Sequence, residues 1–387
     1  FAWDRHKQMT LLRQGDVSAQ GFYQEIPFRY IKDHIFIDVE IEGQTYNFLF
    51  DTGFALSFID DDLLPSVDYQ SVVKSKVSGS SFEKHRVKFG SLSKITIAGI
   101  EFQNTGVGVE DLKYINDDYH CEDQVQGVIG ANLLRKANWQ IDYQQRLIRF
   151  TDDFAKLKVD PAAIILDMTA HQRGFGYGSV KLNFGGIEKN LIFDTGSSGG
   201  FTMGLEAWEE FQQLDPNFVS MQYGNEQKSA KLHPNYLIQI EELAIGELKL
   251  NKALLSLEQG ASSLLGNDFL HHYRVSVNWS QNQLHLEPKE AIQATNPAHF
   301  PLLLRPDFEQ NAILIRAKRS GTEYEKTKLG TQIRTINGED VSSLSRAALC
   351  QFWQNKWPEF ASQAAISIRL QDREAPILLQ KSLLFAE

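Results

Sequence analysis

The chain has 387 residues, of which 42% are hydrophobic and 23% charged, a composition typical of globular proteins with two to three domains. Its formal net charge is −10 at pH 7 and no cluster of Lys and Arg stands out, so nucleic acid is not an expected partner. No apolar run approaches the roughly 18 residues of a membrane-spanning helix, so no membrane-spanning segment is predicted.

The first predicted unit is a β-hairpin that ends at an acid. Residues 41–50 read as a strand, a tight turn at Gly43 and a second strand that runs into Asp51-Thr52-Gly53. Glycine is the residue expected in a turn that needs positive φ. An acid at the end of a buried strand is costly unless its carboxylate has a role.

The same pattern recurs in the second half of the chain. A second Asp-Thr-Gly, beginning at Asp194, follows the first by 143 residues, and its turn glycine is Gly186. An apolar-apolar-Gly segment and a pair of predicted strands are repeated downstream, with an offset of 136 residues at the glycine. Two acids in matching contexts predict a pair that acts together. The repeated segments are 41–50 and 184–193, 128–134 and 264–270, and 141–148 and 277–284.

An apolar strand leading into Asp-Thr-Gly, followed about 70–80 residues later by an apolar-apolar-Gly segment, resembles one lobe of a retropepsin-like aspartic peptidase. Two such lobes on one chain resemble the pepsin-like arrangement, and residues 26–28 and 34–37 resemble bacterial members of this group. The resemblance covers about residues 25–290. It implies a mostly β, bilobal aspartic-protease fold built from two retropepsin-like lobes.

The resemblance implies an aspartic endopeptidase with Asp51 and Asp194 as its catalytic residues and a protein or peptide as its substrate. Two carboxylates about 3 Å apart cannot both ionise cheaply, so they share one proton. The ionised acid activates water as general base, and the protonated acid hydrogen-bonds the scissile carbonyl. The titration belongs to the pair, so the sequence assigns neither role to one residue. The chemistry requires no metal and no cofactor.

Other residues of the two motifs receive supporting roles from the resemblance. The threonine hydroxyls bond across the lobe interface, and the glycines let backbone N–H groups approach the carboxylates. Ser197 matches the residue whose hydroxyl steadies the neighbouring carboxylate, whereas the first motif has the bulky Phe54 at this position. The supporting residues are Thr52, Gly53, Thr195, Gly196 and Ser197.

Lobes of this family carry a β-hairpin flap that closes over the substrate. One candidate is the stretch 77–82, and the other is its counterpart at 222–225. A plain surface turn is the competing interpretation of both. The candidate flap or substrate-binding residues are Gly79, Ser80, Phe82, Tyr223 and Gly224.

The repeat ends near Pro288, and a small α/β unit follows. We expect strands at 312–315, 332–336 and 365–370, a helix at 345–357, and an edge strand after Pro376. The run 330–341 resembles a bacterial PDZ domain, although Thr331 replaces the usual Asp and no glycine-rich carboxylate-binding loop is visible. A PDZ-like domain would bind a peptide ligand as an added strand and recruit substrate. A spacer or a dimer-forming domain is the alternative.

The predicted domains are an N-terminal extension (1–24), a first lobe (25–153), a second lobe (154–292) and a PDZ-like domain (293–387). We interpret Cys121 and Cys350 as two unpaired, core-like thiols, with one long-range disulfide as the alternative. Related bacterial proteins are often exported, which implies the periplasm, the cell envelope or secretion. The competing function is a catalytically inactive peptide-binding scaffold that retains the fold, for which Phe54 would be the first sign.

Overall fold

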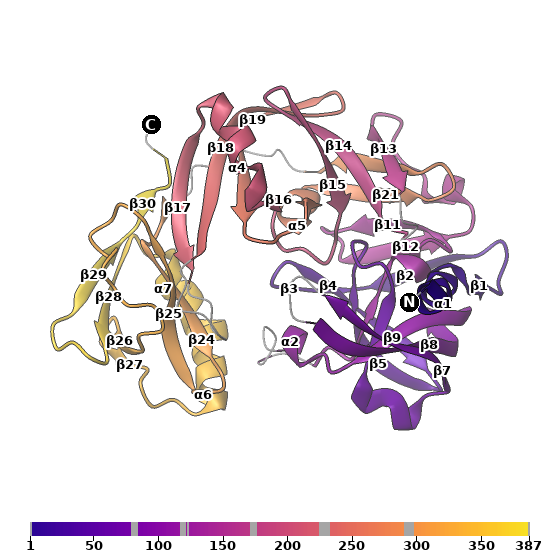
Figure 1. Ribbon diagram of the computed structural model, residues 1–387, viewed down its shortest axis with the longest axis horizontal. Helices are drawn as coiled ribbons and strands as arrows, with labels where there is room; N and C mark the ends of the chain where they lie inside the picture. The colour runs from indigo at the N-terminus through magenta and orange to yellow at the C-terminus, as the bar shows by residue number, and fades with distance from the viewer. Residues whose placement is uncertain are drawn as a thin grey trace.

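The computed structural model describes residues 2–78, 84–116, 121, 124–170, 176–223, 233–289 and 298–385. The protein is mostly β, as the sequence predicts. Figure 1 shows two β-rich bodies, one above the other, with a third body beside them. We call residues 25–153 the first lobe, 154–292 the second lobe and 298–385 the C-terminal unit. Flap candidates Gly79, Ser80, Phe82 and Gly224 lie outside the described residues.

The first lobe is built around the predicted hairpin of β4 and β5, whose turn has positive φ at Glu42 (52°) and Gly43 (76°). Its apolar side chains alternate inward, which buries residues such as Phe48 and Phe50. The strands are β2 (Tyr23–Pro27), β3 (Arg29–Ile31), β4 (His34–Ile41), β5 (Gln44–Phe50), β6 (Ser57–Asp60), β7 (Tyr69–Ser78), β8 (Lys84–Ile97), β9 (Ile100–Glu110), β10 (Gly127–Ile129), β11 (Asn138–Asp142) and β12 (Leu147–Thr151). Its short helices are η1 (Asp61–Ser66), α2 (Lys113–Asn116) and α3 (Ala131–Leu134).

The second lobe repeats this plan with a hairpin of β14 and β15, whose turn has positive φ at Gly185 (62°) and Gly186 (100°). Its strands are β13 (Ile164–Ala170), β14 (Gly178–Phe184), β15 (Ile187–Phe193), β16 (Phe201–Gly204), β17 (Asn217–Tyr223), β18 (His233–Ile245), β19 (Leu248–Glu258), β20 (Leu264–Leu265), β21 (Tyr273–Asn278) and β22 (Gln283–Pro288). Its helices are η2 (Phe154–Leu157), η3 (Leu205–Ala207), α4 (Trp208–Phe211), η4 (Gln212–Leu214) and α5 (Asn267–Leu270).

The two lobes share one sheet. Three strands of each lobe lie in the order β2-β12-β11-β21-β22-β13, and the lobes meet where β11 pairs antiparallel with β21. Gln140 lies opposite Ser276, which is 136 residues further along, and its Nε2 donates a hydrogen bond to the Ser276 hydroxyl (3.1 Å). The downstream repeat has the same offset of 136 residues, so Ser276 is the repeat counterpart of Gln140, and the two face each other. The repeats are thus related by an approximate two-fold rotation about this pair.

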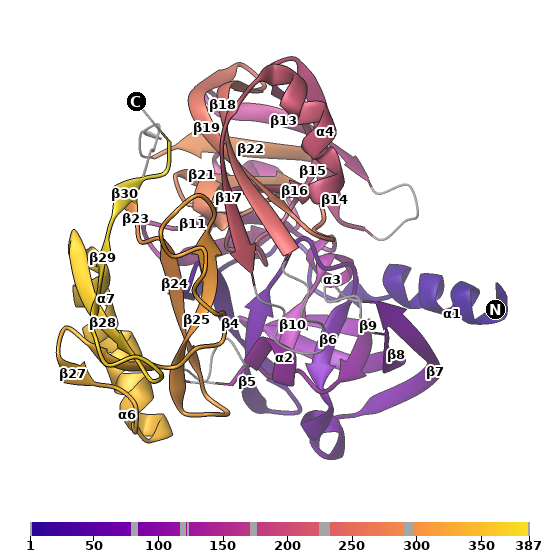
Figure 2. The ribbon, with the colours of Figure 1, turned by 60° about the vertical axis from the view of Figure 1, so that its left-hand side comes forward.

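The N-terminal extension packs against the first lobe. Helix α1 (Ala2–Arg13) buries Leu11 and Leu12 against β7, β8 and β9, and β1 (Asp16–Val17) pairs with β9. Figure 2 shows the beginning of α1 pointing away from the lobe. A side chain at Gly106 would meet the Leu11 carbonyl oxygen at 2.2 Å, so this glycine is what allows the close approach of the helix.

The C-terminal unit has its own apolar core, which includes Leu304, Leu349 and Ile368. The strand predicted at 365–370 is β28, the Asn337-Gly338 turn has positive φ at both residues, and β29 is an edge strand of its sheet. Its strands are β23 (Ala298–His299), β24 (Leu302–Asp307), β25 (Ala312–Arg319), β26 (Ile333–Ile336), β27 (Glu339–Asp340), β28 (Ala365–Leu370), β29 (Ile377–Gln380) and β30 (Ser382–Leu383). The predicted helix consists of α6 (Arg346–Gln351), the π-helical η5 (Phe352–Lys356) and α7 (Trp357–Ser362), and Ser345 caps its start.

The C-terminal unit is attached to both lobes. Strand β25 pairs with β17 of the second lobe, and both views show the two strands side by side (Figures 1 and 2). Phe385, near the end of the described chain, belongs to the same buried apolar cluster as Val219 of β17. A disulfide joins Cys121 of the first lobe to Cys350 on α6. Our interpretation of two unpaired thiols is therefore wrong, because the fold brings together residues that lie 229 positions apart.

Candidate active site

Each Asp-Thr-Gly motif begins where a buried strand ends. Asp51 follows β5 and its N–H donates to the Ile129 carbonyl (3.0 Å), whereas Asp194 follows β15 and its N–H donates to the Leu265 carbonyl (3.0 Å). The parallel pairing of β5 with β10, and of β15 with β20, creates these two equivalent contacts. The apolar-Gly segments therefore lie directly against the motifs, as the resemblance implies.

The two acids meet at the lobe interface. Asp51 is 8% exposed and Asp194 is 9% exposed, and their carboxyl groups are in hydrogen-bond contact with each other. Burial and the charge of Asp194 raise the pKa of Asp51 well above its ordinary value. Burial also raises the pKa of Asp194, but hydrogen bonds from Asp51 and from the Gly196 N–H oppose the increase. The titrations of the two acids are therefore coupled and belong to the pair.

Backbone N–H groups surround the carboxylates. Asp51 Oδ1 accepts hydrogen bonds from the N–H groups of Gly53 (2.9 Å) and Phe54 (2.9 Å). Asp194 Oδ1 accepts a hydrogen bond from the N–H of Gly196 (2.8 Å). Hydrogen bonds of this kind favour the ionised form of a carboxyl group, and they compensate for part of the cost of its burial.

Both glycines are required by the close approach of the opposite acid. A Cβ atom at Gly53 would lie 2.3 Å from Asp194 Cγ, and one at Gly196 would lie 2.2 Å from Asp51 Cγ. Neither glycine has positive φ, so its lack of a side chain is what the site uses. Each motif therefore leaves space for the acid of the other motif.

The two threonines connect the motifs reciprocally. Thr52 Oγ1 donates to the Phe193 carbonyl (2.8 Å) and accepts from the Thr195 N–H (3.0 Å). Thr195 Oγ1 donates to the Phe50 carbonyl (2.8 Å) and accepts from the Thr52 N–H (3.1 Å). These four bonds hold the two loops in one geometry, which is the contact that the resemblance assigns to the threonines.

The residues after the two glycines contact their acids differently. Among the hydrogen bonds of the described residues, none joins the Ser197 hydroxyl to Asp194. Ser197 instead donates its N–H to the Asp194 carbonyl (3.3 Å) and accepts at its own carbonyl from the Asn267 N–H (2.8 Å). Phe54 supplies a second N–H to its acid, while its ring packs edge-on against Phe58 at 5.2 Å. The additional hydrogen bond comes from the Phe54 loop, and the support by the Ser197 hydroxyl stays a prediction.

The hairpins that flank the flap candidates have unequal surroundings. Strands β7 and β8 pair on either side of the first candidate, of which residues 79–82 lie outside the described part of the chain. Tyr223 ends β17 and is paired with Ala317 of β25. The second hairpin is therefore joined to the C-terminal unit at the end of β17.

Two polar residues that the sequence reasoning did not assign to the site also contact it. Asn267 Nδ2 donates to the carbonyls of Asp33 (2.6 Å) and Thr195 (2.7 Å). His34 Nε2 lies 3.0 Å from the Gly196 carbonyl. Asn267 follows a repeated Gly, which is a positional signal, but nothing in the sequence indicates that its amide reaches the other lobe.

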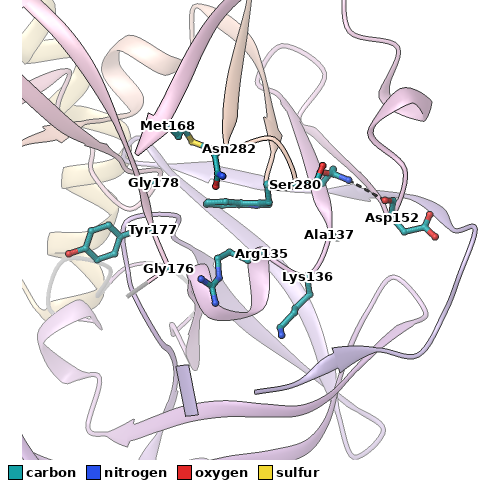
Figure 3. A pocket seen from close by; sticks show the side chains of 12 residues that line it. Arg135, Lys136, Ala137, Asp152, Met168, Gly176, Tyr177, Gly178, Ser280 and Asn282 are labelled. Carbon is teal, nitrogen blue, oxygen red and sulfur yellow. Dashed lines mark hydrogen bonds between the residues drawn. The ribbon is translucent and has the colours of Figure 1, made fainter. Parts of the chain in front are cut away.

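A cavity of 420 Å³ lies between the lobes, away from the acids. Figure 3 shows Arg135, Lys136 and Tyr177 among its lining residues. Arg135 and Lys136 also hydrogen-bond the carbonyls at the end of α1. Since neither Asp51 nor Asp194 lines this cavity, it does not belong to the paired-acid site.

Within the described part of the chain, one group of acids has the spacing of a metal site, namely Asp60, Asp61 and Asp62. Asp60 already accepts the N–H groups of Asp62 and Leu112, so its carboxylate serves as a helix cap. Over the same residues, no helix combines the length and the apolar character needed to cross a membrane.

Comparison with protein families gives a match to an aspartyl protease model over residues 37–133. The match begins in β4, ends in α3 and contains the first Asp-Thr-Gly. Comparison with curated proteins gave no match. The β-rich fold and the family match support an aspartic protease and, more generally, a hydrolase that acts on proteins.

Proposed function

We propose that the protein is an aspartic endopeptidase that hydrolyses peptide bonds with a water activated by Asp51 and Asp194. The observation that carries the proposal is the buried contact between these two acids, one from each lobe, with N–H groups directed at both. Two buried, ionised acids side by side destabilise a fold, and sharing one proton reduces this cost. Such costly pairs occur mainly at functional sites.

In the proposed mechanism Asp194 is the ionised acid and Asp51 the protonated one. Asp194 takes a proton from the water while the water oxygen attacks the scissile carbonyl carbon. Asp51 gives its proton to the carbonyl oxygen. The tetrahedral intermediate then collapses: Asp194 gives its proton to the leaving nitrogen, the C–N bond breaks, and Asp51 takes the proton of one hydroxyl of the intermediate, which restores the pair. The pair, rather than one residue, determines the macroscopic pKa values. A protein segment in extended form is the proposed substrate.

The alternative is a peptide-binding scaffold without activity. The contacts of Phe54 weaken the argument for it, because this residue donates its N–H to Asp51 and packs its ring against Phe58. A scaffold would also gain nothing from two carboxyl groups in contact, since neutral side chains would pack there at lower cost.

The decisive experiment measures cleavage of a mixed peptide library between pH 3 and 8 by the wild type, Asp51→Asn and Asp194→Asn. We expect each substitution to lower kcat by about 10²–10⁴-fold. Asp38→Asn is the matched control, because the Asp38 side chain is 61% exposed. Cleavage that survives both substitutions would rule out the paired-acid mechanism. If folded wild type cleaves nothing at any pH, the scaffold function is favoured.

We further propose that the C-terminal unit is PDZ-like and recruits substrate by accepting an extended peptide as an added strand. Strand β24 ends its sheet, so one edge is available, whereas β25 is already paired on both edges. Fluorescence anisotropy with a library of peptides, using the full chain carrying Asp51→Asn, would test this. Binding that does not change when Leu303 on β24 is replaced by proline would contradict it.

We also propose that the protein functions outside the reducing cytosol, in the periplasm, in the cell envelope or as a secreted protein. The Cys121–Cys350 disulfide supports this, because disulfides persist mainly in oxidising compartments. Thiol labelling of protein taken directly from cells would test it, and two free thiols would contradict it.

A further inference from the structure

A histidine of the first lobe contacts the catalytic loop of the second lobe. His34 begins β4, and its two ring nitrogens lie near two backbone carbonyl oxygens. Nδ1 is 2.8 Å from the Lys32 carbonyl and Nε2 is 3.0 Å from the Gly196 carbonyl. A neutral imidazole has one N–H, so it can donate to only one of these oxygens. The imidazolium cation donates to both, and the geometry therefore fits the charged form.

His34 directly follows the hairpin turn between β3 and β4. Lys32 and Asp33 have φ values of 50° and 60°, in the left-handed region that residues with side chains seldom adopt. This turn directs the Lys32 carbonyl toward His34 and the Asp33 carbonyl toward Asn267 Nδ2. Positive φ at both central residues is usual in a two-residue hairpin turn, here the turn between β3 and β4.

Several charges act on His34. Asp33 on its own turn and Asp194 on the second catalytic loop both favour the imidazolium, whereas burial is the largest influence and lowers the pKa of His34 below its ordinary value. In return, the charge of His34 lowers the pKa of Asp194. On the neighbouring elements, Tyr30 lies near Asp33, Arg146 and Asp268.

We propose that His34 is a positioning residue that, as imidazolium, fixes the second catalytic loop through the Gly196 carbonyl and keeps Asp194 as the ionised acid. This inference rests on the proposed peptidase function, which it deepens. It adds an acidic requirement to the reaction, because only the imidazolium donates to both the Lys32 and the Gly196 carbonyls. The first lobe thereby controls the acid of the second lobe.

The first test does not depend on activity. Imidazole NMR resonances of ¹⁵N-histidine-labelled protein would be followed from pH 4 to 8 in the wild type and in Asp194→Asn. The His34 signals, assigned by their loss in His34→Gln, should show the imidazolium at acidic pH. In Asp194→Asn the midpoint should move to lower pH, because the carboxylate that attracts the cation is gone. A neutral ring throughout, or an unchanged midpoint, would overturn the proposal.

The second test uses steady-state kinetics with a peptide that the wild type cleaves. His34→Gln retains an uncharged donor and should lower kcat about 10-fold, whereas His34→Ala should lower it about 10²-fold, both with little change in KM. The fall in kcat at rising pH should shift in His34→Gln, because one of the titrating groups has been removed. His285→Gln is the matched control, since burial also lowers the pKa of that histidine but its ring lies against Phe154.

The outcomes separate the two proposals. Wild-type kcat and an unchanged pH profile in both His34 variants would overturn the positioning role while the peptidase function stands. If the wild type has no activity, the peptidase function fails, and the NMR titration still decides the charge of His34 and its coupling to Asp194.

Discussion

The two loops carry the same Asp-Thr-Gly but hold their acids differently. Asp51 Oδ1 accepts hydrogen bonds from two N–H groups of its own loop. Asp194 Oδ1 accepts one from its own loop, and the Gly53 N–H and the charge of His34 from the first lobe also lower its pKa. The first loop thus supports its own acid, whereas the second depends on the other lobe. Repeating a motif does not repeat its electrostatics, because the surroundings differ.

The largest effect is expected where the loops are equal. Gly53→Ala and Gly196→Ala should each lower kcat by at least about 10²-fold, because the new methyl group would displace the opposite carboxylate. The kinetic assay would compare them with Gly200→Ala, whose Cβ would meet no atom closer than 3.3 Å, the carboxylate of Asp268. If only one variant lost activity, the equivalence of the two close approaches would be refuted.

The threonine contacts should also respond equally. Thr52→Val and Thr195→Val each remove a hydroxyl that makes two buried hydrogen bonds and leave a backbone N–H and a carbonyl without partners. We expect each to lower the free energy of unfolding by about 2–4 kcal/mol, measured by urea denaturation. The exposed Thr45→Val serves as control. A clear difference between the two variants would show that the reciprocal contact is unequal in solution.

The loops should differ in how stability depends on pH. The pKa of each acid is higher in the folded state than in the unfolded state, so the contribution of this pair to stability is most favourable below the unfolded pKa, about 3.8, and is lost as pH rises through the folded values. Asp51→Asn removes the more strongly shifted acid and should gain about 1–2 kcal/mol over the wild type at pH 7. Asp194→Asn should gain less. Urea denaturation from pH 3.5 to 7 measures both, and a larger gain in Asp194→Asn would contradict the unequal assignment.

The smallest effect is expected at Ser197. Because its hydroxyl makes no bond to Asp194 among the described residues, Ser197→Ala should change the free energy of unfolding by less than about 0.5 kcal/mol and kcat by less than about twofold. Ser198→Ala, on the exposed neighbour, gives the baseline. A loss similar to that of the threonine variants would restore the role that the resemblance assigns to this hydroxyl.

Local sequence patterns predicted much of the fold. The two hairpins that end at Asp51 and Asp194, the positive φ of Gly43 and Gly186, and the strand at 365–370 all follow from apolar alternation and turn residues. The repeat also predicted that the two acids act as a pair. These features depend on residues close together in the chain, where residue type and spacing constrain the backbone strongly.

Contacts between distant segments were not predictable in the same way. The contact of His34 with Gly196, the pairing of β17 with β25 and the disulfide between Cys121 and Cys350 each join elements far apart in the chain. His34, β17, β25 and both cysteines lie outside the repeated segments found in the sequence, so the internal repeat carries no signal for these contacts. The Ser197 hydroxyl illustrates the same point, since the path of the loop, rather than its residue type, decides where a hydroxyl points.

The disulfide between Cys121 and Cys350 closes a covalent ring of the chain that contains the whole second lobe. A single cut of the backbone anywhere between these cysteines would therefore leave one molecule, with both pieces still attached. Such nicked protein would migrate as the intact chain on a denaturing gel without reductant and separate into two fragments when reduced. For a protein exposed to other proteases, the ring keeps the C-terminal unit with the first lobe after the connecting chain has been severed.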